Sequence, residues 1–202
     1  DGSLYRNRCK AECAGAVDIL EGPCKSISTI AEIPILDEAK IEEEAKGFIN
    51  NFYHYLNEIA DGVDMRKEAK KLFLDNGKRI TIQLSNKDSD LIKTVSLNSY
   101  LDYLHGLEAK GQVVKISIGD IKINEPFLEM MDGDFAAESV RASIEQEYQR
   151  YKKYDGKIGT LLYSDKTGKG VEIIARLSEN PGSGKLEWRV YLSNITVEKK
   201  AI

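Results

Sequence analysis

The last third of the chain alternates between apolar and polar residues, as antiparallel strands do. Two such runs flank residues 180–184, which read Asn-Pro-Gly-Ser-Gly. Proline lacks an N–H donor and glycine favours turns, so these residues cannot continue a strand. The pattern therefore predicts a β-hairpin within residues 156–197. Its apolar positions are Val171, Ile173, Ala175 and Leu177 in the first strand and Trp188, Val190 and Leu192 in the second.

Residues 37–60 instead repeat their apolar positions every three to four residues, which is typical of a helix. Asp37 can cap the start of this helix, because its side chain can accept a hydrogen bond from a backbone N–H of the first turn. Asp61-Gly62 ends the helix. We expect one broad apolar face, which must pack against other elements. That face comprises Ile41, Ala45, Phe48, Ile49, Phe52, Tyr53, Leu56 and Ile59.

Two shorter helices are expected further along the chain. Asp64 can begin a helix that ends near Leu74, and Ser96 can begin another over residues 97–107. Strands are predicted around them at residues 80–84, 91–95 and 114–118.

The residues that follow the strand at 114–118 predict an irregularity in the sheet. Gly119-Asp120 interrupts its alternation, which resumes in shifted phase at Ile121, and such a shift indicates a β-bulge. Residues 125–133 have a less regular pattern.

Residues 134–153 fit both a helix and a strand. Val140, Ile144, Tyr148 and Tyr151 are spaced as on a helix, and the Ala, Glu, Gln and Lys content favours one. The same residues also alternate with polar positions, as in a strand. Local signals leave both assignments open.

Composition and charge argue against one class of partner, nucleic acids. Of 202 residues, 42% are hydrophobic and 31% are charged, which is typical of a globular chain. The chain has 29 basic and 33 acidic residues, so its net charge is −4, and no basic run with interleaved aromatic residues stands out. We therefore expect no nucleic-acid partner. The sequence also has no apolar run long enough to span a membrane.

All three cysteines lie in the first 24 residues, and their spacing resembles a known family. The segment carries Asp1-Gly2, Tyr5, Asn7, Cys9, Cys13, Ala14-Gly15 and Gly22-x-Cys24. It is similar to the C-terminal half of a Kazal-type module, a small disulfide-rich fold. The resemblance implies that each cysteine pairs with one upstream of residue 1, where the reactive-site loop would also lie. It further implies an extracytoplasmic protein (periplasmic, outer-membrane-associated or secreted).

The cysteines also allow plainer interpretations. A disulfide between Cys13 and Cys24 is geometrically feasible, whereas Cys9 and Cys13 on one helix are poorly placed to pair. Three thiols without a nearby histidine fit a structural zinc site badly, and we expect no metal. We divide the chain into a Kazal-like segment (1–25), a linker around Pro34 (26–38) and a main domain (39–202).

The main domain resembles the NTF2-like, or SnoaL-like, group of cystatin-like folds. The resemblance rests on the long first helix, residues 67–74 leading into a strand, residues 96–101, and residues 163–169 followed by 187–190. It implies an α+β fold, a cone of N-terminal helices packed on a curved antiparallel sheet. It also implies that residues 134–153 form a strand.

Motifs for catalysis are scarce. The sequence has no nucleophile elbow, phosphate-binding loop, dinucleotide fingerprint or zinc-protease motif. Its two histidines, His54 and His105, lie beside tyrosines or at a helix end, where we expect no catalytic role. We therefore predict no catalytic residue, no cofactor and no enzymatic activity.

Aromatic residues are the best candidates for a cavity or an interface, because they offer large apolar area at low entropic cost. The candidates are Phe52, Tyr103, Tyr148, Tyr151, Trp188 and Tyr191.

Three functional hypotheses follow. The first is a non-enzymatic extracytoplasmic binding or scaffolding protein with a protein partner, in which apolar side chains fill the cone. The second is a Kazal-type serine-protease inhibitor whose reactive loop precedes residue 1. The third is a SnoaL-like lyase or isomerase, or a binder of a small hydrophobic ligand.

Overall fold

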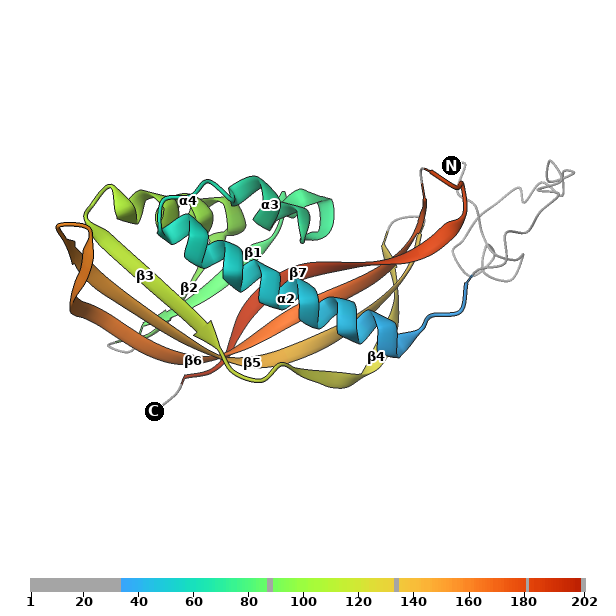
Figure 1. The fold of residues 1–202 in the computed structure, drawn as a ribbon. Coiled ribbons are helices and arrows are strands. Elements are labelled where there is room, and N and C mark those ends of the chain that lie inside the picture. Colours follow the sequence, from blue (N-terminus) through green and yellow to red (C-terminus); the bar gives the residue numbers. More distant parts are fainter. Residues whose placement is uncertain (1–33, 87–88, 133–134, 181, 201–202) are drawn as a thin grey trace, which may run out of the picture.

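The computed structural model describes residues 34–86, 89–132, 135–180 and 182–200. Within these ranges, helices pack on a seven-stranded curved sheet (Figure 1). This arrangement confirms the predicted α+β class of helices on a curved sheet. The Kazal-like segment, with Cys9, Cys13 and Cys24, lies outside the described residues.

The helices follow the predicted order. The longest, α2, has the predicted N-cap, because the Asp37 side chain accepts a hydrogen bond from Lys40 N. Ser96 likewise caps α4 by accepting from Ser99 N. The second helix is shorter than expected: it begins two residues after Asp64, and Met65 occupies the cap position. The helices are α2 (Glu38–Ala60), α3 (Arg66–Lys71), the short 3₁₀ helix η1 (Leu74–Gly77) and α4 (Leu97–Glu108).

The strands form one sheet in the order β2-β1-β7-β6-β5-β3, and β4 also pairs with β5. We expected an antiparallel sheet, but β1 and β7 run parallel where Ile82 faces Ile195. The sheet is therefore mixed. Its strands are β1 (Thr81–Asn86), β2 (Ser89–Ser96), β3 (Gln112–Ile118), β4 (Lys122–Asp132), β5 (Phe135–Tyr154), β6 (Lys157–Glu179) and β7 (Leu186–Lys200).

The bulge predicted at Gly119-Asp120 joins β3 to β4. Ile118 pairs with Gln146 and Lys122 pairs with Ser143, so three residues lie opposite two on β5. The extra residue is the mark of a bulge. Residues 125–132 belong to β4, and its pairing with β5 shifts register between Asn124 and Leu128, as the less regular pattern predicted.

Of the ambiguous residues 134–153, those from Phe135 onward lie in a strand, β5. It pairs along one edge with β6 and along the other with β3 and β4. Its alternate residues Val140, Ala142 and Ile144 pack in the core, and this tertiary packing outweighs the helical propensity of the segment.

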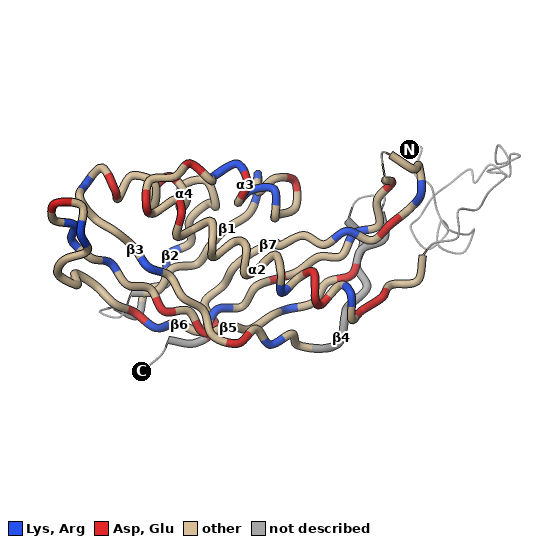
Figure 2. Tube along the Cα trace, in the orientation of Figure 1, with Lys and Arg blue, Asp and Glu red and all other residues tan. Residues whose placement is uncertain are grey.

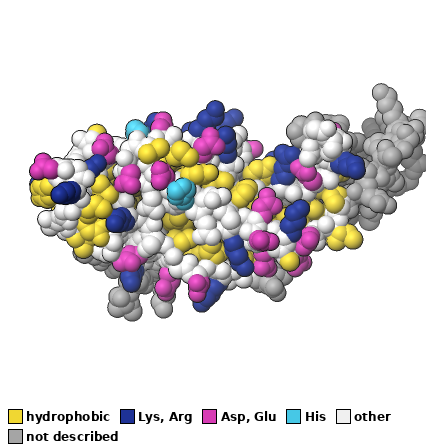
Figure 3. Space-filling view, viewed as in Figure 1, with side chains coloured by type: hydrophobic (Ala, Val, Ile, Leu, Met, Phe, Trp, Pro, Cys, Tyr) yellow, Lys and Arg dark blue, Asp and Glu magenta, His cyan; other side chains and the backbone are white. Residues whose placement is uncertain are grey.

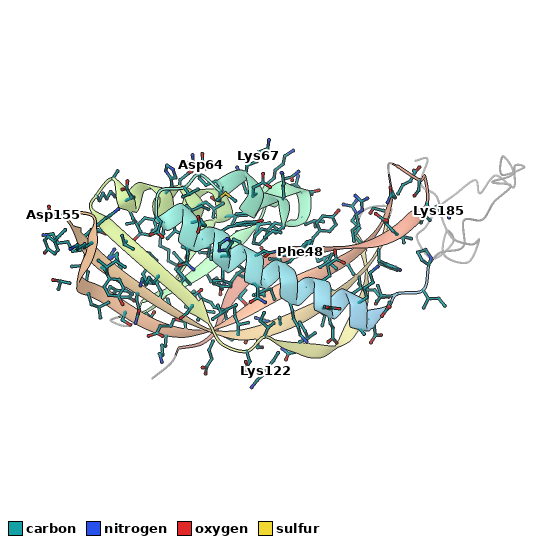
Figure 4. The ribbon with its side chains drawn as sticks, viewed as in Figure 1. Phe48, Asp64, Lys67, Lys122, Asp155 and Lys185 are labelled. Carbon is teal, nitrogen blue, oxygen red and sulfur yellow. The ribbon has the colours of Figure 1, made fainter. Side chains whose placement is uncertain are left out.

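The core lies between α2 and the concave face of the sheet, across which α2 runs diagonally (Figure 1). Asn57 of α2 anchors the helix to β3, because its side chain donates to Ile116 O and accepts from Ile116 N, each at 2.8 Å. Phe48 of α2, labelled in Figure 4, is half-buried and packs against the core.

The two long hairpins turn at opposite ends of the molecule, marked by Asp155 and Lys185 in Figure 4. Asp155 and Gly156 both have positive φ, as the Asp-Gly turn of a two-residue hairpin requires. Near this turn apolar side chains reach the surface, as Figure 3 shows at that end. They are Tyr154, Ile158, Leu161 and Leu162.

Charged residues of both signs alternate along the trace in Figure 2. Within the described ranges, no helix is long and apolar enough to cross a membrane.

Candidate ligand-binding pocket

The inward face of β5 changes from apolar to polar along the strand. Val140, Ala142 and Ile144 are buried in the core. The next positions on the same face are Gln146, Tyr148 and Arg150, which line a cavity. We expected apolar side chains to fill the whole cone, and in this half the expectation is wrong.

The neighbouring strand, β6, changes in the same place. Val171, Ile173 and Ala175 are buried in the core, whereas Tyr163, Asp165, Thr167 and Lys169 line the cavity. The two polar stretches lie side by side, since Tyr148 pairs with Asp165 and Gln146 with Thr167. They form the floor of the cavity.

The cavity has a volume of about 440 Å³, within the range of pockets that enclose small organic molecules. It lies beneath α4, and its lining residues on β5 and β6 belong to the halves of these strands nearest the β5–β6 turn. The other lining residues include Leu84 and Ser85 of β1, Lys93 and Val95 of β2, and Tyr100 and Tyr103 of α4.

Lys169 is the most deeply buried cation of the pocket, with 2% of its surface exposed. Its Nζ donates to Gln83 O at 2.6 Å, close to where β1 and β7 pair through Ile82 and Ile195. Burial lowers the pKa of Lys169 to about 8, and the charge of Asp165 opposes that shift. An amine with this pKa can give or accept a proton near neutral pH.

Asp165 is the carboxylate of the pocket. Its Oδ2 accepts from Ser85 Oγ at 3.2 Å and from Thr167 Oγ1 at 3.3 Å, and these hydroxyls are 2.8 Å apart. The two hydrogen bonds hold the Asp165 carboxylate near Lys169. No ion pair between Asp165 and Lys169 is found among the described residues, because Lys169 Nζ donates to Gln83 O instead.

A cluster of tyrosines forms the aromatic part of the pocket. The rings of Tyr148 and Tyr163 meet edge to face, with centroids 6.0 Å apart. Burial raises the pKa of both Tyr148 and Tyr100, and the nearby Tyr103 adds to the rise for each. These hydroxyls therefore stay protonated and can serve as hydrogen-bond donors at neutral pH.

Arg150 lies at the end of the pocket nearest the β5–β6 turn. Its Nη1 donates to Tyr103 Oη at 3.2 Å, and its guanidinium carbon lies 5.9 Å from the centre of the Tyr163 ring. Its Nε is buried and has no hydrogen-bond partner among the described residues.

Two of the six aromatic candidates from the sequence, Tyr103 and Tyr148, line the pocket. Phe52 lies in the core instead, edge to face with Phe73 at 4.9 Å. Trp188 donates from Nε1 to Pro34 O at 2.8 Å, far from the pocket lining.

The remaining candidates, Tyr151 and Tyr191, are half-buried and do not line the cavity. His54 is exposed and His105 is half-buried, and neither lines the cavity. The described histidine, aspartate and glutamate side chains nowhere form a group of three that could hold a metal ion.

Sequence reasoning missed Lys169, Asp165 and Arg150 as pocket residues. Each lies an even number of positions from a core residue on the same strand, which places it on the inward face once the strand is known. This spacing alone does not show that the inward face encloses a cavity.

No protein-family model matches the sequence, and a search of curated proteins finds no match. Solved structures of similar fold include an NTF2-like superfamily protein from Salmonella enterica serovar Typhimurium. It is 10% identical, the alignment covers 82% of this chain and 94% of that one, and the TM-score is 0.41.

Two further structures are named for an activity. A candidate scytalone dehydratase from Novosphingobium aromaticivorans is 8% identical, with 83% of this chain and 89% of that one covered and a TM-score of 0.40. A candidate dehydratase of the NTF2-like family from Streptomyces avermitilis is 11% identical, with 79% and 95% covered and a TM-score of 0.39.

These names contradict our expectation that the chain is not an enzyme, and we withdraw that expectation. Likeness at this level concerns the fold, and it assigns no reaction to this chain.

Proposed function

We propose that the protein is a lyase or isomerase that acts on a small amphipathic organic molecule in the pocket, by proton transfer. The observation that carries this proposal is Lys169, a buried amine at the edge of a cavity of about 440 Å³. Burial of a cation is costly, and the single hydrogen bond of Lys169 Nζ found among the described residues goes to Gln83 O. A strongly perturbed amine in such a cavity is typical of a functional site.

The neutral amine of Lys169 would accept a proton from a substrate carbon next to a carbonyl group. The electron pair of that C–H bond moves into the carbonyl, which becomes an enolate, and Lys169 becomes an ammonium. The protonated hydroxyl of Tyr148 would donate to the enolate oxygen, where charge develops.

The second half of the reaction returns the proton. In an isomerase the substrate carries a C=C bond next to the deprotonated carbon, so the intermediate is a dienolate; the Lys169 ammonium protonates its far carbon and the double bond moves into conjugation with the carbonyl. In a lyase, the enolate expels a hydroxyl group from the next carbon, and the same proton leaves with it as water. Either route restores the neutral amine, so the protein undergoes no net change.

The apolar and aromatic side chains of the pocket lining suit a substrate that is mostly apolar. Leu84, Val95 and the aromatic rings of Tyr148 and Tyr163 all line the cavity. Apolar area removed from water there would supply binding energy, while the polar groups fix orientation.

The proposal is tested by hydrogen–deuterium exchange at carbon, measured by NMR in D₂O with cyclic ketones and β-hydroxyketones as probes. We expect the full chain to accelerate exchange next to the carbonyl and Lys169→Met to abolish the acceleration. Lys166→Met is the matched control, since Lys166 is exposed on the same strand and does not line the cavity. Equal exchange by the wild type and Lys169→Met would contradict the proposal.

A further inference from the structure

Arg150 is a half-buried arginine that lacks a carboxylate partner among the described residues. Three other arginines form ion pairs: Arg66 with Asp64 and Asp102, Arg141 with Glu198, and Arg189 with Glu187. No such pair is found for Arg150 within the described ranges, where its hydrogen bond goes to the neutral hydroxyl of Tyr103. A guanidinium stays charged at any physiological pH, so this cation enters the pocket without a counter-ion of its own.

The side chains that line the cavity include more cations than anions, which also favours an anionic ligand. Three cations line the cavity, Lys93, Arg150 and Lys169, against the single carboxylate of Asp165. Asp165 is already held by the hydroxyls of Ser85 and Thr167. The pocket therefore favours an anionic ligand over a neutral one of the same shape.

Arg150 has unused donors where such an anion would bind. A guanidinium carries five N–H donors, and its flat fork matches a carboxylate through two parallel hydrogen bonds. Its Nη1 donates to Tyr103 Oη, and no hydrogen-bond partner of its Nη2 is found within the described ranges. The protein itself covers Nε, so the remaining N–H groups of Nη1 and Nη2 are the donors that an anion can reach.

Arg150 and Lys169 lie at opposite ends of the pocket floor. In the register of β5 and β6, Lys169 pairs with Ile144 and Arg150 pairs with Tyr163. Six strand positions from 144 to 150 correspond to about 20 Å of extended backbone, which the curvature of the sheet and the inward reach of both side chains shorten. Between them lie the rings of Tyr148 and Tyr163.

We propose that the substrate is an elongated aromatic or alicyclic carboxylic acid, whose carboxylate binds Arg150 and whose ring system lies along Tyr148 and Tyr163. This inference rests on the proposed function for the reacting end, which then lies near Lys169. Arg150 acts as a specificity-determining residue and takes no part in proton transfer.

The test compares biphenyl-4-carboxylate with biphenyl-4-carboxamide, which have nearly the same shape and differ in charge. Isothermal titration calorimetry with the full chain should give a dissociation constant about tenfold lower for the acid, the gain expected from a charge-assisted hydrogen-bonded pair. Arg150→Met should remove the preference and leave affinity for the amide within about twofold. Arg150→Lys should keep part of the preference, because it retains the charge but not the fork.

Arg141→Met is the matched control, since Arg141 lies on the same strand, is exposed and does not line the cavity. A preference for the acid that survives in Arg150→Met, or that disappears in Arg141→Met, would overturn the inference. Failure of both compounds to bind the wild type would overturn it as well. The carbon-exchange test of Lys169 is read separately, so acid preference without exchange contradicts only the proposed reaction.

Discussion

The concave face of the sheet has two halves that share the same two strands and differ in chemistry. Towards the β6–β7 turn, Val140 and Ile173 are buried beneath the apolar face of α2. Towards the β5–β6 turn, Tyr148, Asp165 and Lys169 lie beneath α4 and enclose a cavity. One continuous pair of strands thus carries a packed core at one end and a polar pocket at the other.

This division shows how the fold can keep buried polar groups. Close packing in the first half stabilises the strands, and the second half inherits their geometry through the register. The pocket side chains then hold their positions although they contribute little stability, or even reduce it. We therefore expect truncations in the packed half to lower stability much more than substitutions in the pocket, and the following predictions test this in order of their effect on stability.

The largest loss of stability is expected from Phe52→Ala. Phe52 is 1% exposed and packs edge to face against both Phe73 and Tyr53. Its truncation should lower the free energy of unfolding by about 3–5 kcal/mol, because it leaves a cavity in a packed core. Urea denaturation followed by circular dichroism measures this loss. His54→Ala is the control: His54 lies two residues further along α2 and is exposed, so its truncation should change stability little. A loss below about 1 kcal/mol would show that α2 does not anchor the core.

In the other half, Lys169→Met should make stability less dependent on pH. The pKa of Lys169 falls from its ordinary 10.5 to about 8 on folding. Between these pH values the unfolded chain therefore binds more protons than the folded chain. The free energy of unfolding of the wild type rises with pH across that window for this reason. Below pH 8 the full cost of burying the cation remains.

From pH 7 to pH 10 the wild type should gain about 2.5 kcal/mol relative to Lys169→Met. Urea denaturation of both proteins at each pH gives this difference, and subtraction removes titrations that they share, such as those of the tyrosines. Parallel pH profiles would mean that Lys169 is not buried as a titrating amine.

The apolar half could largely be predicted from the sequence. The face of α2 repeats over many turns and Asp37 marks its start, so local periodicity was sufficient. The β6–β7 hairpin was also predictable, because Pro181 and the glycines around it interrupt two strongly alternating runs.

The polar half could not be predicted in the same way. Polar residues that alternate with other polar residues, as in residues 163–169, are indistinguishable from a solvated strand until the covering elements are known. The partner of Lys169, Gln83, is 86 positions away in the chain and reaches it through the parallel contact of β1 and β7. Local patterns contain no information on that contact.

The smallest change in stability is expected from Tyr148→Phe. Only a hydroxyl is removed, so the free energy of unfolding should change by about 1 kcal/mol or less. Under the proposed mechanism the same hydroxyl stabilises the enolate, so the rate of carbon exchange should fall about 10²-fold. Thermal unfolding and the D₂O exchange rate are measured on the same sample. Tyr151→Phe, on the same strand but outside the cavity lining, loses the hydrogen bond from its hydroxyl to Gln149 Oε1. Its stability should therefore fall by a similarly small amount, while its exchange rate stays at the wild-type value. If Tyr148→Phe keeps the wild-type rate, another donor must bind the enolate oxygen, and Tyr100 of the same wall is the next to be tested.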